Sequence, residues 1–221
     1  MITPEFSLEF DLLYNNIMSN AAPGLNEYEK SLFLTQAQES IVRDIYNGKY
    51  NGISFEGTEE ASAYLNPLVK QVTMDCYVEG DGVSGNSVFF PIPPDMWFIT
   101  YETALIKDEC LKCCHQRNVV VRPVTQDTYY SISRNPFRRD NDRRVLRLLS
   151  DNKIELISRY PIKSYTVRYL SKPQPIILTD LTDSGLSIEG RTYVTECQLH
   201  PAIHRAILSR AVQLAKAAWA S

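Results

Sequence analysis

The sequence predicts an α+β protein in which a helical lobe, built from both ends of the chain, carries an inserted strand-rich antiparallel lobe. Two observations lead to this expectation. Apolar residues recur at helical spacing before residue 66 and again after Pro201. Between them, β-branched and aromatic residues alternate with turn signals such as "EGDGVSGN" and "PIPPD". We therefore expect residues 1–67 with 200–221 to form the helical lobe, and residues 68–199 the strand-rich lobe.

Two helices are expected near the N-terminus. Thr3 can cap the first, and Pro4 then occupies its first position, where proline is favoured. Its apolar face is predicted to hold Phe6, Phe10, Leu13 and Ile17. After the break "NAAPGLN", Asn26 can cap a second helix that stops near Gly48. The apolar face of this second helix is predicted to hold Leu32, Leu34, Ala37, Ile41 and Ile45.

Two further helices complete the expected helical lobe. Thr58 can cap a short one that ends at Asn66-Pro67, because the residue before proline disfavours helix. The last runs from Pro201 to Trp219. Its apolar stripe is predicted to hold Ile203, Ile207, Ala211, Leu214 and Ala218.

The middle of the chain is expected to form strands. Tyr165, Val167 and Tyr169 alternate with polar residues, which is the pattern of a half-buried strand. One helical piece is expected to interrupt this region near Thr125–Ser133. The predicted strands cover residues 72–78, 88–92, 97–105, 118–121, 154–157 and 165–170.

Composition limits the class of protein. The 221 residues are 44% hydrophobic and 22% charged, which is ordinary for a folded domain. A net charge of −3 argues against a dedicated nucleic-acid binder, which would usually be basic. No run of about 18 apolar residues predicts a membrane span. The acidic N-terminus is unlike a secretory signal, so we expect the chain to stay in the cytosol where it is made.

The run "CLKCCH", residues 110–115, concentrates three of the five cysteines. Cys110 and Cys113 have a spacing that suits a zinc site, with His200 and His204 as the other close pair. A haem attachment site would need CxxCH, which the run does not match, and a redox pair would need an α/β context. The favoured interpretation is a strand or hairpin with buried cysteine, so no metal and no cofactor is predicted.

Arginines are dense in "RNPFRRDNDRRVLRLL". Guanidinium groups bind carboxylates or phosphates through two hydrogen bonds at once. Two interpretations are equally favoured: the arginines contact another subunit, or they form a solvated loop balanced by Asp140 and Asp142. Contact with DNA is the less favoured third interpretation. The candidate inter-subunit residues are Arg134, Arg138, Arg139, Arg143 and Arg144.

Catalytic patterns are not found in the sequence. It contains no G-x-S-x-G, no glycine-rich phosphate loop and no H-E-x-x-H. Asp75, Glu79 and Asp81 lie beside a glycine-rich turn and are expected to be solvated. We therefore expect a protein that is not an enzyme.

Several longer runs resemble, in the same order, a family of virion structural proteins of tailed bacteriophages, particularly crAss-like and other phages of gut Bacteroidetes. These runs are "FDLLYNNIMSNAAPGLNEYEKSLFLTQAQESIVRDIY", "RNPFRRDNDRRVLRL", "IELISRYPIKSYTVRYLSKPQPIILTDL" and "CQLHPAIHRAILSRAVQLAKAAW". The family has no cysteine cluster as a recognised mark, so the resemblance does not support a family-wide metal role.

The resemblance implies a structural, non-enzymatic role in assembly. Proteins of this kind are similar to neck or tail ring components that join the portal to the tail, usually as dodecameric rings around the DNA channel. The expected partners are further copies of the chain, the portal and other neck or tail ring proteins. Phage DNA would pass through the channel transiently, and a wall that is not basic would bind it weakly. The expected location is the virion, at the head–tail junction or tail, after assembly in the host cytoplasm.

Overall fold

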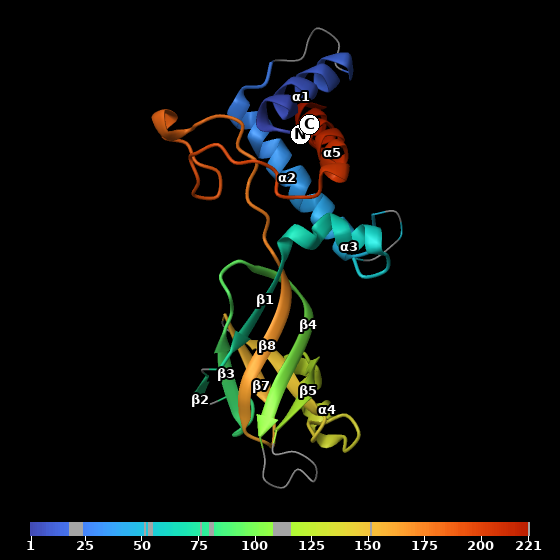
Figure 1. Cartoon of the computed structure of the whole chain (residues 1–221), viewed down its shortest axis with the longest axis vertical. Helices are drawn as coiled ribbons and strands as arrows, with labels where there is room; N and C mark the ends of the chain where they lie inside the picture. The colour runs from blue at the N-terminus through green and yellow to red at the C-terminus, as the bar shows by residue number, and fades with distance from the viewer. Residues whose placement is uncertain are drawn as a thin grey trace. The chain divides into compact units, whose positions relative to one another are not determined.

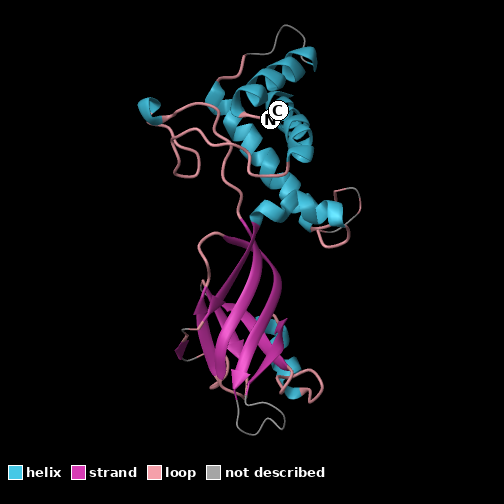
Figure 2. Ribbon diagram, in the orientation of Figure 1, coloured by secondary structure: helices cyan, strands magenta, loops and turns pink. Residues whose placement is uncertain are grey.

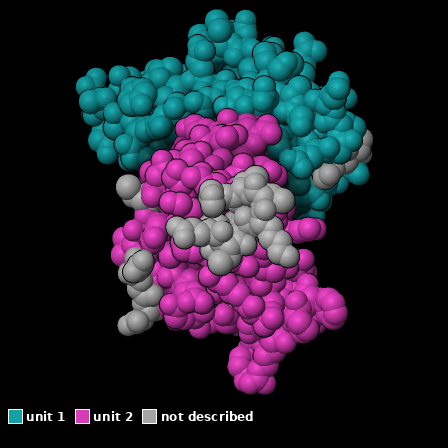
Figure 3. All heavy atoms as spheres, turned by 60° about the horizontal axis from the view of Figure 1, so that its bottom comes forward, with its two compact units in different colours: residues 1–68, 172–221 teal, residues 69–171 magenta. Residues whose placement is uncertain are grey.

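The structure, a computed structural model, describes residues 1–17, 24–50, 52, 55–75, 77–79, 82–107, 116–150 and 152–220. The chain divides into two compact units, which Figure 3 distinguishes by colour. The helical unit contains residues 1–68 and 172–221, and the sheet unit contains residues 69–171. Figure 2 shows helices in the first and mainly strands in the second, so the predicted α+β class is confirmed. No helix in these ranges is long and apolar enough to cross a membrane.

The helices α1 (Thr3–Ile17), α2 (Glu27–Tyr46) and α5 (His204–Ala220) form the core of the helical unit, and α5 contacts both of the others (Figure 1). Asn26 caps α2 as predicted: its Oδ1 accepts from Glu29 N at 2.8 Å, and Glu29 Oε2 accepts from Asn26 N at 2.9 Å. Gly48 follows the helix with φ +72°, a conformation that favours glycine. The expected limits of α2 are therefore correct.

The buried faces of these helices differ in part from the expected stripes. In α1, Tyr14 is buried with Phe6 and Phe10, whereas Leu13 is only half-buried. In α5, Val212 and Ala215 are buried near the end of the helix, whereas Leu214 is half-buried and Ala218 is exposed. The side chain of Ile17 lies outside the described residues. These shifts follow from helical geometry, because positions three and four residues apart share a face and either spacing can continue a stripe.

The short helix α3 (Glu59–Leu65) is capped by Thr58, whose Oγ1 accepts from Ala61 N at 3.1 Å. It continues into the 3₁₀ helix η1 (Asn66–Leu68). The final helix likewise begins with a 3₁₀ turn, η3 (Pro201–Ile203), before α5. The expected helices are present at all of these positions, with tightened turns at the ends next to proline.

Residues 172–199 correct the expected boundary between the lobes. They were predicted to belong to the strand-rich lobe, yet they pack in the helical unit, where Ile177, Leu181 and Ile188 meet Tyr28 and Leu32 of α2. The segment contains the 3₁₀ turn η2 (Thr182–Ser184) and two isolated bridges but no strand. Beyond these internal bonds, part of its backbone finds hydrogen-bond partners on α2.

Those partners are a row of buried polar side chains on α2. Ser31 Oγ accepts from Leu178 N at 3.0 Å, and Thr35 Oγ1 accepts from Ile176 N at 3.1 Å. Gln38 Nε2 donates to Gln174 O at 2.8 Å. Residues 31, 35 and 38 share one helix face, and 174, 176 and 178 alternate along an extended chain. We call Ser31, Thr35 and Gln38 the polar row; it holds the extended segment as a neighbouring strand would.

The sheet unit contains, in the described residues, one eight-stranded sheet of order β1-β8-β4-β5-β6-β7-β3-β2. The strands are β1 (Val69–Met74), β2 (Val78–Glu79), β3 (Ser87–Pro91), β4 (Met96–Lys107), β5 (Gln116–Pro123), β6 (Arg144–Ser150), β7 (Lys153–Ile157) and β8 (Ile162–Ser171). The sheet curls around one apolar cluster that includes Phe90, Ile106, Val145, Tyr165 and Val167. All neighbours pair antiparallel except β5 and β6.

The parallel pair corrects the expectation of a purely antiparallel lobe. Val121 pairs with Val145 in parallel, and the helix α4 (Gln126–Arg134) lies in the connection between the two strands. Parallel neighbours need a long crossover, and the predicted helix at 125–133 is part of that crossover. The strand β6 itself was not predicted, because its arginines were read as part of the arginine-rich loop.

Charged residues inside the sheet unit are paired. Arg147 Nε lies 2.9 Å from Glu102 Oε1, and Tyr165 donates to the same carboxylate oxygen at 2.6 Å. These three side chains come from β6, β4 and β8 and are at most 9% exposed. Elsewhere, buried Glu155 accepts from Val83 N at 2.8 Å and from the Ser87 hydroxyl. A Cβ at Gly82 would overlap both Glu155 and Ser87, so the turn needs glycine there.

Candidate inter-subunit surface

The arginine loop, residues 134–144, begins where α4 ends. Arg134 lies over the ring of Tyr130, with 4.0 Å between the guanidinium carbon and the ring centroid. Tyr130 is 62% exposed, whereas Tyr129 and Ile132 of the same helix pack on Leu146 and Leu148 of β6. The helix therefore fixes one face on the sheet and presents an aromatic residue and a cation on the other.

The loop is built by its own hydrogen bonds. Asn135 Oδ1 accepts from Phe137 N at 3.0 Å, and Asn135 O accepts from Arg138 N at 3.0 Å and Arg139 N at 2.9 Å. This turn leaves the Phe137 ring 85% exposed. Arg144 closes the loop, because its Nη1 donates to the carbonyl oxygens of Phe137 and Arg138, both at 3.1 Å. The Arg144 side chain therefore stabilises the conformation of the loop.

The aspartates do not neutralise the loop in the way that one interpretation of the sequence expected. Asp140 accepts from Arg159 N at 3.0 Å, and Asp142 pairs with Arg117 at 3.1 Å. Both partners belong to the body of the sheet unit, so these contacts anchor the loop. Within the described ranges, no ion pair involves Arg134, Arg138, Arg139 or Arg143.

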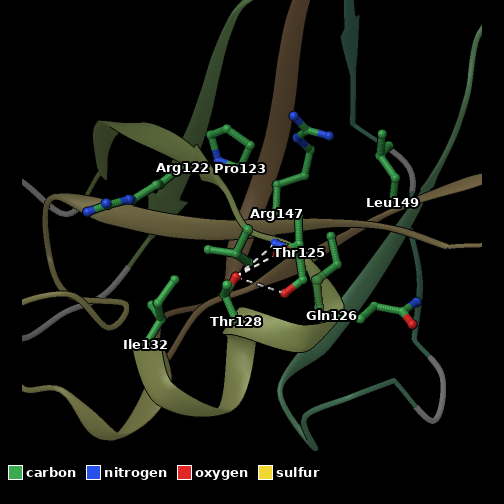
Figure 4. A pocket seen from close by; sticks show the side chains of 10 residues that line it. Arg122, Pro123, Thr125, Gln126, Thr128, Ile132, Arg147 and Leu149 are labelled. Carbon is green, nitrogen blue, oxygen red and sulfur yellow. Dashed lines mark hydrogen bonds between the residues drawn. The ribbon is translucent and has the colours of Figure 1, made fainter.

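A groove of about 490 Å³ lies between the first turn of α4 and β6 (Figure 4). Thr125 and Thr128 bond to each other in its wall, with 2.7 Å between their hydroxyl oxygens. Arg147 also lines it but is held by Glu102, while the Arg122 side chain extends away from the threonines. Leu149, 49% exposed, adds apolar surface beside it. The groove therefore lies beside α4, the helix that leads into the arginine loop.

The four residues of the alternative zinc site are described only in part. Cys110 and Cys113 lie outside the described residues. Although they are four residues apart, His200 and His204 do not share a helix face, because His200 is the cap that precedes the 3₁₀ turn and its Nδ1 accepts from Ala202 N at 3.2 Å. Among the residues that the structure describes, no three potential ligands cluster in a way that could hold a metal ion.

His204 is buried and fully engaged. Its Nε2 lies 2.9 Å from Leu199 O, and its Nδ1 lies 3.0 Å from the amino group of Met1. Since a carbonyl oxygen only accepts, Nε2 carries the proton and Nδ1 is the acceptor. Burial, with the nearby amino group and His200, lowers the pKa of His204 against the opposing hydrogen bond to Leu199. A metal would have to displace these contacts.

Two exposed features were missed from the sequence. Phe137 stands within the quoted arginine run, and "NPF" after a helix is a turn signal that could have marked it as exposed. On α1, Leu8 and Leu12 are 66% and 63% exposed, although the helix is otherwise amphipathic. Their exposure could have been recognised from the sequence, because Leu8 and Leu12 share one helix face with the charged residues Glu5 and Glu9.

Comparison with known proteins supplies the context for these surfaces. The family described as "Phage tail ring protein 3/4" matches residues 1–221. The chain is 49% identical over 219 residues to "Ring protein 3" of Bacteroides phage crAss001, covering 97% of this chain and 95% of that protein. It is 36% identical over 228 residues to "Ring protein 4/5" of the same phage, covering 97% and 92%. The chain therefore belongs to the phage tail ring protein 3/4 family.

Proposed function

We propose that this protein is a non-enzymatic structural subunit of a tailed-phage virion, forming an oligomeric ring at the head–tail junction or upper tail around the DNA channel. The observation that carries the proposal is the family match over the whole chain, together with two relatives that are both named as ring proteins. Since nearly the full length of each relative is covered, the match extends over both units rather than one shared module.

The proposed ring has twelve copies, and its neighbours are the portal and other neck or tail ring proteins. Arg134, Arg138, Arg139 and Arg143 would make contacts between subunits, with Arg144 holding their loop in shape. Exposed arginine beside exposed aromatic residues is the composition of strong protein–protein contacts. The net charge of −3 is compatible with a channel wall that DNA passes without being retained.

Native mass spectrometry and electron microscopy of the purified chain test the ring directly. A closed assembly of one defined copy number is expected, either alone or on adding the portal. Density for this chain in images of intact virions would then place the ring in the neck or the tail. A chain that stays monomeric with the portal and is missing from virions would overturn the proposal.

Duplex-DNA binding by the arginine loop is the second candidate function. It is favoured by four loop arginines without an ion pair in the described ranges, beside the exposed Tyr130 and Phe137. Titration of the chain with duplex DNA at about 50 mM salt separates the two candidates, since phosphate contacts weaken steeply as salt rises. Binding in the micromolar range would support this role, and its absence at low salt would exclude it.

A further inference from the structure

The outer face of α1 is a mixed acidic and apolar stripe. Glu5, Leu8, Glu9 and Leu12 follow one another at spacings of three, one and three residues, which places them on one face of the helix. The opposite face, with Phe6, Phe10 and Tyr14, is buried. Leu8 and Leu12 are each more than 60% exposed, so two leucines at adjacent turns of one helix face water. We call Glu5, Leu8, Glu9 and Leu12 the α1 stripe.

A groove of about 500 Å³ adjoins the stripe, between α1 and α5. Leu12 and Leu13 line it from α1, and the buried Leu208 forms part of its wall from α5. Glu9 stands at the groove from α1, while Arg205 and Ser209 complete the lining from α5. The groove is therefore apolar inside with charged side chains around it, which suits one apolar side chain flanked by charged ones.

The arginine loop has the opposite pattern. Its tip is a single aromatic ring, Phe137, that is 85% exposed, and Arg134 and Arg138 flank it with exposed side chains. Tyr130 adds a second exposed aromatic residue on the adjoining helix. Leaving such a ring in water is unfavourable, and aromatic residues with arginine are enriched where partners bind.

The two units of the chain differ in the sign of their net charge. The helical unit carries fourteen acidic and eight basic residues, a net charge of −6, and the sheet unit carries twelve acidic and fifteen basic residues, a net charge of +3. The α1 stripe lies on the acidic unit and the arginine loop on the basic one. DNA would suit the loop but would be repelled by the stripe, whereas another copy matches both surfaces.

We infer that Phe137 of one copy enters the groove between α1 and α5 of the next copy, with Arg134 and Arg138 facing Glu9 on the α1 stripe. This contact joins two different patches of the same chain, so it repeats head to tail and can close a ring. The inference rests on the proposed function, since it assigns the seam between neighbouring subunits of that ring.

Two charge reversals test the contact between chains. Arg138→Glu and Glu9→Arg are each expected to weaken association at least about tenfold, because each places like charges together. An equimolar mixture of the two variants should restore association, since every loop then meets a stripe of opposite charge on a neighbour. Native mass spectrometry should show equal numbers of the two variants in the restored assembly.

A second variant tests the apolar part. Phe137→Ala should weaken association by about tenfold or more, as for other exposed aromatic anchors. Tyr193→Ala, at an exposed aromatic residue of the helical unit, is the matched control and should leave association unchanged. Far-ultraviolet circular dichroism of each variant establishes that the fold is retained.

The outcomes separate this inference from the proposed function. If the wild-type ring forms but neither reversal nor Phe137→Ala weakens it, the seam is wrong and the ring stands. Restoration in the double variant Glu9→Arg/Arg138→Glu but not in the mixture would put the contact within one chain, against the inference. A wild-type chain that never associates, with or without the portal, overturns both.

Discussion

Glu102, Arg147 and Tyr165 form a cluster of polar side chains inside the curled sheet. Burial raises the pKa of Glu102, although Tyr165 and Arg147 both favour its charged form. Burial and the adjacent carboxylate raise the pKa of Tyr165 far above its usual range, so the phenol remains a donor. Because the three residues come from three strands, their mutual satisfaction fixes how β4, β6 and β8 face one another.

Removing one partner of this cluster should be costly. Glu102→Ala leaves the buried Arg147 guanidinium without its carboxylate, and we expect a loss of about 3–5 kcal/mol in the free energy of unfolding. Arg122→Ala, at an exposed arginine of the same unit, should change it by less than about 0.5 kcal/mol. Urea unfolding followed by circular dichroism measures both, and equal effects would contradict the assigned role of the cluster.

His204 should make stability depend on pH. Its pKa is lowered in the folded protein, mainly by burial, so the unfolded chain binds a proton more readily. The stabilisation is therefore present above the ordinary histidine pKa and is lost as pH falls toward the lower folded value. The midpoint temperature of thermal unfolding should be lower at about pH 5.5 than at about pH 7.5. His204→Gln should reduce this difference, whereas His200→Gln should leave it unchanged. The same drop in both variants would point to other groups.

Gly82 is required by close approach rather than by its backbone angles. Since a Cβ there would overlap the Glu155 carboxylate and Ser87, Gly82→Ala should cost about 1–3 kcal/mol. Gly85 lies in the same turn, and a Cβ added to it would meet no heavy atom within 4 Å, so Gly85→Ala is a matched control. Chemical unfolding of the two variants should separate them clearly; a neutral Gly82→Ala would mean that the turn relaxes freely.

Predictions for single residues were correct where neighbours in the sequence determine the structure. They failed where contacts between distant parts of the chain determine it. Asn26 and Thr58 were identified as helix caps because capping depends on neighbours three residues away. Arg147 was grouped with the loop arginines, since nothing in its local sequence announces the partner Glu102 forty-five positions earlier. The exposed Phe137 was missed because apolar residues are normally expected inside.

At the scale of elements, the polar row on α2 replaces a strand-to-strand ladder with side chains. Thr35→Val keeps the shape of the side chain but leaves Ile176 N without its acceptor, and Gln38→Ala removes the donor to Gln174 O. Each should lower the free energy of unfolding by about 1–3 kcal/mol. Gln36→Ala, exposed on the same helix, should have little effect. Denaturant unfolding tests this, and three equal values would exclude the row as a structural device.

The element order was largely predictable, and the exceptions have physical causes. The strand β7 was predicted although residues 154–157 are all buried. The strand β6 was missed because its arginines were assigned to the arginine-rich loop, and its residues 145–148 are all buried because α4 covers the outer face. Residues 172–199 were assigned to the strand-rich lobe although no strand was predicted within them, because they follow the last predicted strand and contain many β-branched residues. Gln174, Ile176 and Leu178 find hydrogen-bond partners on a helix, and no periodicity in the segment indicates that contact.

At the scale of the whole molecule, charge is unevenly divided between the two units. If oppositely charged units meet at subunit seams, association should weaken as salt screens them. Raising salt from about 50 mM to about 500 mM should therefore lower the fraction of assembled chain measured by light scattering. Arg138→Glu should flatten this dependence. Association that strengthens with salt would indicate an apolar seam instead.

The helical unit contains both ends of the chain, so it can be completed only after the sheet unit between them has been synthesised. The sheet unit is continuous, so it can fold while later residues are still being synthesised. The aromatic face of α1 is covered only after α5 has been synthesised, because the ring of Phe6 lies 5.3 Å from that of His204, near the other end of the chain. A chain released early from the ribosome lacks α5 and with it one wall of the groove beside Leu12. Under the inferred seam, a chain without α5 would therefore lack the groove that receives Phe137 of its neighbour.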